Sequence, residues 1–176
     1  MEPTVPDQPY NVLFLCTGNS ARSILGEALM NKMGGGLFHA YSAGSQPKGD
    51  VHSMSLEVLD SFGYPTDGLH SKNWSEFTKP GAPEFDFIFT VCDNAAGESC
   101  PVWPGKPLTA HWGVEDPAAV EGDGQRQAFV DALSYLKRRI ELFLMLPLPS
   151  IDEMSVRSKL AAIGREEGAS AKAKES

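Results

Sequence analysis

One loop constrains this chain more than any other feature of its sequence. Residues 11–16 form a continuous apolar run, which predicts a strand buried on both faces. From Arg22 onward apolar residues recur at helical spacing, so the residues between connect a strand to the N-terminus of a helix. Gly18 and Asn19 in this loop tolerate left-handed backbone angles. The loop can therefore curl its N–H groups around an anion at the helix N-terminus.

Two side chains add chemistry to this anion site. Arg22 carries a planar guanidinium that can hold two oxygens of a tetrahedral oxyanion. Cys16 ends the strand below the loop, where the N–H groups and Arg22 favour its thiolate and should bring its pKa from about 8.5 into the range of about 3.5–7.5. We therefore predict that Cys16 is a nucleophile. The predicted oxyanion-binding residues are Thr17, Gly18, Asn19, Ser20, Ala21, Arg22 and Ser23.

A structural interpretation of the same loop stays open, in which Cys16 is a core cysteine and Arg22 a solvated helix residue. It leaves Gly18, Asn19 and Ser23 without a reason to occur together between a strand and a helix. A nucleotide-binding loop is excluded, because no Gly-x4-Gly-Lys-Ser/Thr segment occurs in the chain.

The rest of the chain alternates predicted strands and helices. Strands are expected at residues 11–16, 37–43, 85–92 and 107–112, and helices at residues 22–33, 53–62 and 125–145. This alternation predicts an α/β fold with a four-stranded parallel sheet flanked by helices. We expect a flexible arm at residues 1–9, one domain at residues 10–146, and a C-terminal extension at residues 147–176 that contains a linker, a short helix at 152–163 and a disordered tail. Because the extension carries no Cys and no motif, we expect it to be dispensable for chemistry.

The composition excludes several classes of partner. The formal net charge of −8 disfavours binding to nucleic acid or to anionic lipid. No apolar run approaches the roughly 20 residues of a membrane-spanning helix, and the first ten residues are acidic and Pro-rich, unlike a signal peptide. We expect a cytoplasmic monomer with no cofactor, no metal, and no nucleic-acid or membrane partner.

The three cysteines of a chain with no export signal favour reactive thiols in a reducing compartment over structural disulfides. Cys92 ends the predicted strand at residues 85–92, so it should share an edge of the parallel sheet with Cys16. Cys100 can carry oxidising equivalents from a buried site to the surface by thiol–disulfide exchange. The alternative is that both are inert thiols. Zinc is disfavoured, because no Cys-x2-Cys spacing occurs and no His lies near the two cysteines in sequence.

An acidic loop follows the last predicted strand. Pro117 biases the preceding Asp116 toward an extended backbone, which projects its carboxyl group away from the turn. A protonated Asp116 can donate to an oxygen that leaves the substrate, and an ionised one can help to deprotonate an attacking thiol. The alternative is a solvated acidic turn. We expect His111 and Trp112 to pack behind this loop.

Together these segments resemble a known family. Residues 16–23 (CTGNSARS), 41–44 (YSAG), 91–101 (VCDNAAGESCP) and 111–118 (HWGVEDPA) are similar, in this order, to four segments of the arsenate reductases that share the low-molecular-weight protein tyrosine phosphatase fold. These are the oxyanion loop, the end of the second strand, the redox segment and the general-acid loop. The resemblance implies this fold, here with a C-terminal extension, and the reduction of arsenate to arsenite for arsenic detoxification.

The resemblance also implies catalytic roles. Cys16 attacks arsenate held by the loop and Arg22, and Asp116 helps the oxide to leave. Cys92 then attacks Cys16, arsenite departs, and a Cys16–Cys92 disulfide forms. Cys100 attacks Cys92 in turn, and an external thiol protein reduces the resulting Cys92–Cys100 disulfide. Thioredoxin is the expected electron donor, with glutaredoxin as the other candidate.

Supporting roles are implied for further residues. In the family an Asn at the position of Asn19 braces the loop, and a Ser at the position of Ser23 helps to lower the pKa of the nucleophile. Some of these arsenate reductases bind potassium near the loop through an Asn, a Glu, a Ser and an Asp. The first three match Asn19, Glu27 and Ser42, but Asn73 stands at the position of the Asp, so the sequence leaves a potassium site undecided and assigns no metal ligand.

Two other functions remain as alternatives. In a low-molecular-weight protein tyrosine phosphatase, Cys16, Arg22 and Asp116 would suffice. The residues at 118–119 are both alanines, however, where a phosphotyrosine slot needs aromatic side chains, and the other two cysteines would have no role. We still expect weak phosphatase activity, because the loop cannot exclude phosphate by geometry alone. The second alternative is a non-catalytic protein that binds oxyanions.

Overall fold

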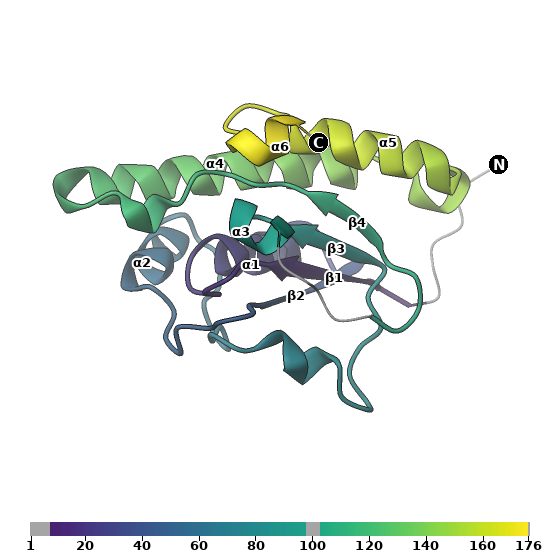
Figure 1. Ribbon diagram of the computed structural model, residues 1–176, viewed down its shortest axis with the longest axis horizontal. Coiled ribbons are helices and arrows are strands. Elements are labelled where there is room, and N and C mark those ends of the chain that lie inside the picture. Colours follow the sequence, from purple (N-terminus) through teal and green to yellow (C-terminus); the bar gives the residue numbers. More distant parts are fainter. Residues whose placement is uncertain (1–7, 98–102, 176) are drawn as a thin grey trace.

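The computed structural model describes residues 8–97 and 103–175, and a parallel sheet with helices packed against it forms the centre of the molecule (Figure 1). The strands are β1 (Tyr10–Leu15), β2 (Phe38–Ala43), β3 (Phe87–Thr90) and β4 (Leu108–His111). They form a four-stranded sheet in the order β2–β1–β3–β4, with every neighbouring pair parallel. The predicted α/β fold with a four-stranded parallel sheet is confirmed. Residues 1–7 of the predicted arm lie outside the described residues.

The helices are α1 (Arg22–Met33), α2 (Ser53–Ser61), α3 (Asp93–Gly97), α4 (Gln125–Leu144), α5 (Glu153–Gly164) and α6 (Ala171–Glu175). Short 3-10 turns lie at Trp74–Phe77, Pro117–Ala119, Gly122–Gly124 and Leu148–Ser150. Helix α1 ends before Gly35 and Gly36, whose φ angles of +58° and +86° are rarely open to a residue with a side chain. No helix in the described part of the chain is long and apolar enough to cross a membrane.

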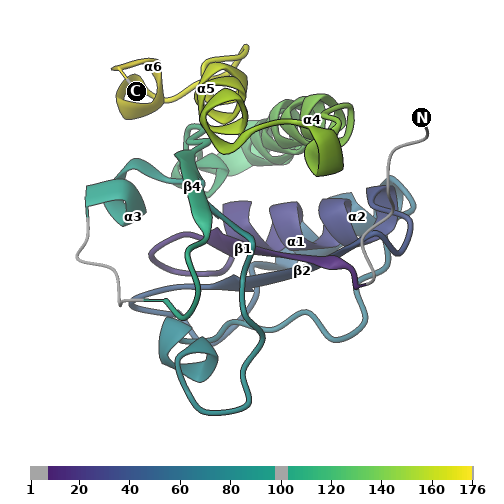
Figure 2. The same cartoon turned by 90° about the vertical axis from the view of Figure 1, so that its right-hand side faces the viewer.

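Both faces of the sheet are covered, which explains the continuous apolar run in β1. Val12 and Phe14 lie in the core that α1, α4 and α5 share with the sheet, whereas Leu13 and Leu15 lie in a second cluster with Phe77. Alternate residues of a strand point to opposite faces, so each face receives apolar side chains. Figure 2 shows α1 and α4 on one face and the segment between α2 and β3 on the other.

The order of the strands places the ends of β1 and β3 at one crevice. β2 lies on one side of β1 and β3 on the other, so the connections after these strands run in opposite directions across the sheet. Loops separate at such a switch point and leave a crevice at the carboxyl ends of the strands. Leu15 pairs with Thr90 at this edge. Cys16 and Cys92 follow these two residues closely, so the topology brings both cysteines to the same crevice.

Helix α5 joins the C-terminal extension to the core. It agrees with the predicted helix to within one residue at each end. Leu160 is fully buried, and its carbonyl oxygen accepts a hydrogen bond from Trp112 Nε1 at 3.0 Å. Gly164 lies so close to the backbone that a Cβ there would overlap the carbonyl oxygen of His111. Truncation after residue 150 would therefore expose part of the core as well as remove the extension.

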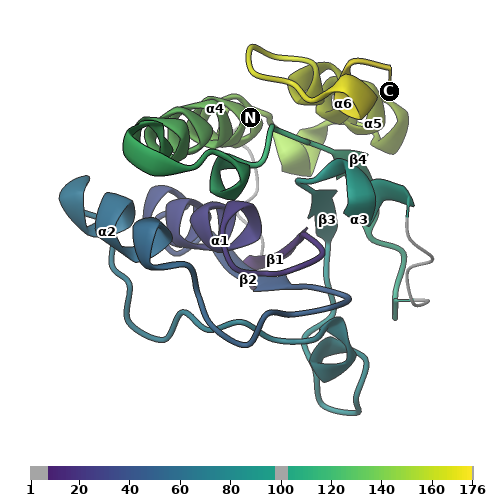
Figure 3. The same ribbon diagram turned by 60° about the vertical axis from the view of Figure 1, so that its left-hand side comes forward.

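The tail after α5 differs from the sequence-based prediction of disorder. Residues 168–175 contain α6, and Ala173 is fully buried. Arg139, a buried residue of α4, donates from Nη2 to Glu166 O and from Nη1 to Glu167 O, each at 3.0 Å. Figure 3 shows α5 and α6 beside α4 at the β4 end of the sheet. Small, weakly hydrophobic residues predict disorder, but here a buried guanidinium holds the chain that leads into α6.

We expect Leu160→Ala to lower the free energy of unfolding by about 2–5 kcal/mol, because it opens a cavity where α5 packs on the sheet. Met154→Ala on the same helix is the control, since Met154 is 80 % exposed and its loss should change stability by less than about 0.5 kcal/mol. Urea denaturation followed by tryptophan fluorescence measures both. Equal stabilities of Leu160→Ala and the wild type would mean that α5 is not part of the core.

Candidate active site

The loop between β1 and α1 adopts the left-handed turn that an anion site needs. Asn19 has a φ of +44°, in the region that Asn reaches more readily than most residues, and it is fully buried. Its Oδ1 accepts a hydrogen bond from Lys72 N at 2.9 Å, and its Nδ2 donates to Ser23 Oγ at 2.8 Å. These bonds tie the loop to α1 and to the segment before β3, and they support the bracing role that the resemblance implies. The effect of Ser23 on Cys16 stays a prediction.

The segment after β2 holds the carbonyl groups of the loop. Gln46 N donates to Thr17 O and Lys48 N donates to Gly18 O, each at 3.0 Å. The C=O and N–H groups of a trans peptide point in opposite directions, so the N–H groups that follow these carbonyls point the other way. Gly18 N–H is one of them, and it donates to the sulfur of Cys16. The loop thus directs N–H groups toward the nucleophile, as an oxyanion site requires.

Arg22 links the loop to the predicted general acid. Its Nη1 donates to Val114 O at 2.8 Å, and its Nη2 lies 3.7 Å from Asp116 Oδ2. Its Nε is buried and has no hydrogen-bond partner among the described residues, so this donor is left for an oxyanion. Asp116 has an extended backbone (φ −74°, ψ 109°), as Pro117 predicts, and its Oδ1 accepts from Ala118 N at 3.0 Å.

These residues line one pocket of about 390 Å³. The pocket brings together Cys16, Arg22, Cys92 and Asp116, the four described residues that the sequence predicts to be catalytic. Its complete lining is Cys16, Thr17, Gly18, Asn19, Ser20, Ala21, Arg22, Gln46, Lys48, Cys92, Asn94 and Asp116. Ser23 is absent from this set because it is buried behind Asn19.

Three lining residues, Gln46, Lys48 and Asn94, were not predicted from the sequence. A signal for two of them exists, because Gln46 and Lys48 follow a strand of a parallel sheet and the carboxyl ends of such strands share one crevice. Lys48 adds a positive charge to the pocket of an acidic chain.

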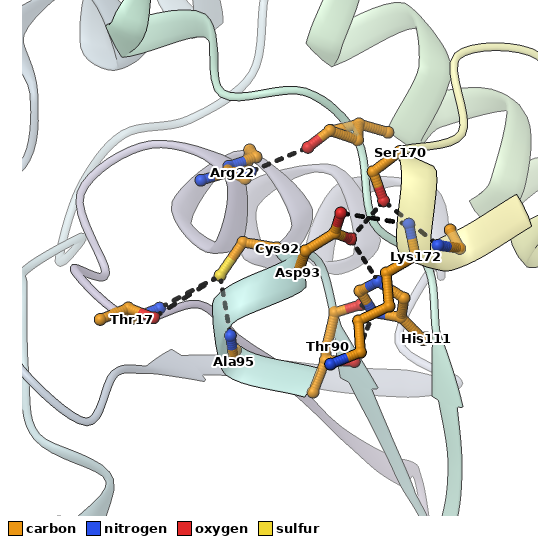
Figure 4. A network of polar contacts seen from close by, with 11 residues as sticks. Thr17, Arg22, Thr90, Cys92, Asp93, Ala95, His111, Ser170 and Lys172 are labelled. Atoms are coloured by element: carbon orange, nitrogen blue, oxygen red, sulfur yellow. Dashed lines mark hydrogen bonds and ion pairs between the residues drawn. The ribbon is translucent and has the colours of Figure 1, made fainter. Parts of the chain in front are cut away.

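Cys16 and Cys92 are buried free thiols joined by a hydrogen bond. Cys92 Sγ also accepts hydrogen bonds from Thr17 N and Ala95 N, each at 3.4 Å (Figure 4). The hydrogen bond from Cys16 and these N–H groups lower the pKa of Cys92 to about 5, although burial opposes the shift. The hydrogen bond to Cys92 and burial raise the pKa of Cys16, although Arg22 opposes this shift.

The prediction of a lowered pKa for Cys16 is therefore wrong for the reduced protein, because the first thiolate of the pair forms on Cys92. Two acids that share a hydrogen bond lose their first proton as a pair. Two backbone N–H groups donate to Cys92, whereas Cys16 accepts from Gly18 N–H. The negative charge of the pair therefore lies on the sulfur of Cys92. A proton that moves along the hydrogen bond from Cys16 to Cys92 makes Cys16 the thiolate.

Asp93, next to Cys92, binds residues from two other parts of the chain (Figure 4). His111 Nε2 lies 2.8 Å from Asp93 Oδ1, and Ser170 Oγ donates to the same oxygen at 2.5 Å. His111 thus contacts the residue that follows Cys92, and its packing behind the acidic loop stays a prediction. Cys100 lies outside the described residues, and its predicted exchange with Cys92 stays a prediction.

The residues that the resemblance relates to potassium surround a lysine. Lys72 Nζ donates to Ser42 O at 2.9 Å and to His70 O at 2.7 Å, and it lies 3.8 Å from Glu27 Oε1. Burial lowers the pKa of Lys72 and raises that of Glu27, while their mutual attraction opposes both shifts. Asn73 bonds elsewhere, to the backbone after β2. The ammonium group takes the oxygens that a metal cation would need, so this set does not fit potassium. Across residues 8–97 and 103–175, no group of three or more His, Cys, Asp or Glu side chains could hold a metal ion.

Comparison with known proteins relates this site to one family. A family model described as low molecular weight phosphotyrosine protein phosphatase matches residues 11–157. The chain is 31 % identical to an arsenate reductase of Halalkalibacterium halodurans and 28 % identical to one of Oceanobacillus iheyensis, in each case over 134 residues that cover 75 % of this chain and 93 % of the relative. A solved structure described as an arsenate reductase in the phosphate binding state is 26 % identical, with a TM-score of 0.63, and the match covers 77 % of this chain and 96 % of that one.

We expect Lys72→Met to lower the free energy of unfolding by about 3–5 kcal/mol, because it leaves the Glu27 carboxylate buried without its cation. Lys79→Met is the control, since Lys79 is exposed. Thermal and urea denaturation measure the difference. Exchange of sodium for potassium chloride should leave the wild-type midpoint unchanged, because the ammonium group fills the site. If Lys72→Met were as stable as the wild type, Lys72 would not be the cation that stabilises the buried Glu27 carboxylate.

In Cys100→Ser protein we expect one thiolate at neutral pH, lost on acidification with a midpoint at about pH 5, the pKa of Cys92. Ultraviolet absorbance of the thiolate measures this titration. Cys16→Ala should raise the midpoint, because it removes the hydrogen-bond donor to Cys92. The pKa of Cys92 is lower in the folded protein than in the unfolded chain, where it is about 8.5. The resulting stabilisation is complete at a pH above the pKa of Cys92 in the unfolded chain. It is lost as the pH falls through the pKa of Cys92 in the folded protein. Absence of a thiolate at pH 7 would refute this assignment.

Proposed function

The chain belongs to the low molecular weight phosphotyrosine protein phosphatase family, and we propose that within this family it is an arsenate reductase. The hydrogen bond between Cys16 and Cys92 beside an oxyanion pocket carries the proposal. A phosphatase needs one thiol, because water completes its cycle by attacking the phosphorylated cysteine. Arsenate reduction needs a second thiol next to the first, because two electrons must leave protein sulfur.

The lining of the pocket supports a small inorganic oxyanion as substrate. None of the described lining residues is aromatic, whereas a phosphotyrosine ring needs an apolar slot. Arg22 and Lys48 supply positive charge, and the buried Nε of Arg22 offers a hydrogen bond that no described residue accepts. In a chain with a net charge of −8, capture of an anion depends on such local groups. The similarity to proteins named arsenate reductase agrees with this substrate.

The first step is the attack of Cys16 on arsenate. As the thiol proton moves along the hydrogen bond to Cys92, the Cys16 sulfur attacks arsenic, an S–As bond forms and an As–O bond breaks. The released oxygen takes up two protons and leaves as water. Asp116, which lies 3.7 Å from Arg22, delivers a proton to that oxygen. Arsenic remains in the +5 state in this adduct.

The second step is the reduction. Cys92 loses its proton, which the hydrogen bonds from Thr17 N and Ala95 N favour, and its thiolate attacks the sulfur of Cys16. An S–S bond forms, the S–As bond breaks, and its electron pair stays on arsenic. Arsenic passes from +5 to +3 and leaves as arsenite, while two thiols are oxidised to the Cys16–Cys92 disulfide.

The third step restores Cys16. The Cys100 thiolate attacks the Cys92 sulfur, the Cys16–Cys92 bond breaks, and Cys16 leaves as a thiolate. An external dithiol protein, thioredoxin or glutaredoxin, then reduces the Cys92–Cys100 disulfide and is itself oxidised. The cycle needs reduced thiols at rest, so the proposal includes a reducing, cytoplasmic location.

We expect Cys92→Ser to abolish arsenate reduction and to leave hydrolysis of p-nitrophenyl phosphate largely intact. Phosphate-ester cleavage needs Cys16, Arg22 and Asp116 but no second thiol. Arsenate-dependent NADPH oxidation, run in parallel with the thioredoxin and the glutaredoxin systems, measures the first activity and identifies the donor. Cys16→Ser is the control, because both activities need its sulfur and both should disappear.

Cys100→Ser should permit one turnover and trap the Cys16–Cys92 disulfide, which mass spectrometry of non-reduced peptides detects. The relay is wrong if Cys92→Ser reduces arsenate normally and the wild type forms no arsenate-dependent Cys92–Cys100 linkage. The protein would then be a phosphatase, or a single-cysteine reductase served by a small external thiol.

A further inference from the structure

The carboxylate of Asp93 joins the C-terminal segment to the helix that follows Cys92. Ser170 Oγ donates to its Oδ1 at 2.5 Å, and Lys172 N donates to its Oδ2 at 3.2 Å. His111 Nε2 lies 2.8 Å from Oδ1. Asp93 is the first residue of α3, so donors from β4 and from the start of α6 hold the N-terminus of that helix (Figure 4).

The hydroxyl group of Ser170 has a fixed orientation. Ser170 is 2 % exposed, and its Oγ accepts a hydrogen bond from Ala173 N at 3.4 Å while it donates to Asp93. A hydroxyl group has a single proton to donate, so acceptance from α6 leaves that proton for the carboxylate. Burial would raise the pKa of Asp93, but the hydrogen bonds from Ser170 and His111 outweigh it and lower the pKa.

The same segment also contacts the loop that leads to Asp116. Ser170 N donates to Gly113 O at 2.9 Å, and Ala169 forms an antiparallel bridge with Val114. Val114 O in turn accepts the hydrogen bond from Arg22 Nη1. Gly113 leaves no room for a side chain, because a Cβ there would overlap Ser170 Oγ. The hydrogen bond from Ser170 N and the bridge at Ala169 hold the backbone of the segment independently of the Ser170 hydroxyl group.

We propose that Ser170 is a positioning residue for Cys92, which acts through Asp93 to keep the Cys92 sulfur against Cys16. Ser170, Asp93, Cys92 and Arg22 all line one small cavity of about 140 Å³, so Ser170 and the thiol it positions belong to the same part of the site. The residues matched by the family model end at 157, and Ser170 lies beyond them. The benefit to arsenate reduction rests on the proposed function, but the positioning of the thiol does not.

The test measures disulfide formation without arsenate. In Cys100→Ser protein, diamide takes two electrons and two protons from Cys16 and Cys92 and leaves them as a disulfide. We expect Ser170→Ala to slow this reaction about tenfold, the effect of losing one hydrogen bond to a charged group. Hydrolysis of p-nitrophenyl phosphate by the same variant should be largely intact, as in Cys92→Ser, because it forms no disulfide with Cys92. A purely structural role would lower both rates together.

Two further variants isolate the hydrogen bond between Ser170 and Asp93. Ser155→Ala is the matched control, since Ser155 Oγ also donates to a carboxylate in the extension, that of Asp152, and it should leave both rates unchanged. Asp93→Asn should reproduce the effect of Ser170→Ala. If Ser170 acts through Asp93, the double variant should be no slower than Asp93→Asn alone. The Asp93 variant also keeps the proposal testable should Ser170→Ala fail to fold.

The outcomes separate the two proposals. A diamide rate equal to wild type in Ser170→Ala, equal losses of both rates, or full additivity with Asp93→Asn would each overturn the role of Ser170. If diamide behaves as expected but arsenate produces no Cys16–Cys92 disulfide in the Cys100→Ser protein, arsenate reduction fails and the positioning of Cys92 stands. If arsenate produces the disulfide at the same rate with and without the Ser170 hydroxyl group, arsenate reduction stands and the positioning role of Ser170 fails.

Discussion

The hydrogen bond between Cys16 and Cys92 is the contact on which the rest of the site depends. A buried thiol pair beside one guanidinium carries one negative charge far more readily than two, and the shared proton decides which sulfur holds it. Cys92 holds the charge at rest because backbone N–H groups of Thr17 and Ala95 donate to it. The same proton can return Cys16 to the thiolate form when a substrate lies against Arg22. In the proposed reaction, this single hydrogen bond lets the two cysteines act in turn.

Much of this arrangement follows from sequence, because it depends on local backbone chemistry and on sheet topology. The apolar run before Cys16 predicts a strand covered on both faces, and Asn19 predicts the left-handed turn of the loop. Pro117 predicts the extended backbone of Asp116. The resemblance also identified Gly44, and the structure supplies a reason for it, since a Cβ there would overlap carbonyl oxygens of the loop. Each of these predictions needs neighbours in sequence or adjacent strands, and nothing more distant.

The remaining features depend on contacts between distant residues, which a single sequence does not encode visibly. The pKa of Cys16 is raised by its hydrogen bond to Cys92 and by burial, which outweigh Arg22 and the Gly18 N–H group of its own loop. Lys72 is one lysine among several until folding buries it beside Glu27. The tail of small residues after α5 is ordered because Arg139, on α4, binds the carbonyl oxygens that precede α6. No pattern within that tail predicts its contact with Arg139.

The two halves of the site are held with different strength, and the proposed thiol exchange would benefit from this difference. Asn19 fixes the oxyanion loop through bonds that are fully buried, so the groups that bind the oxyanion stay in place. Helix α3 has five residues, and the side chain of Asp93 that holds it is 37 % exposed, where water competes for its hydrogen bonds. A short element held in this way opens at a lower free energy than the core. In the proposed relay, the Cys92 sulfur can then be held against Cys16 for the first exchange and leave it afterwards without unfolding of the sheet.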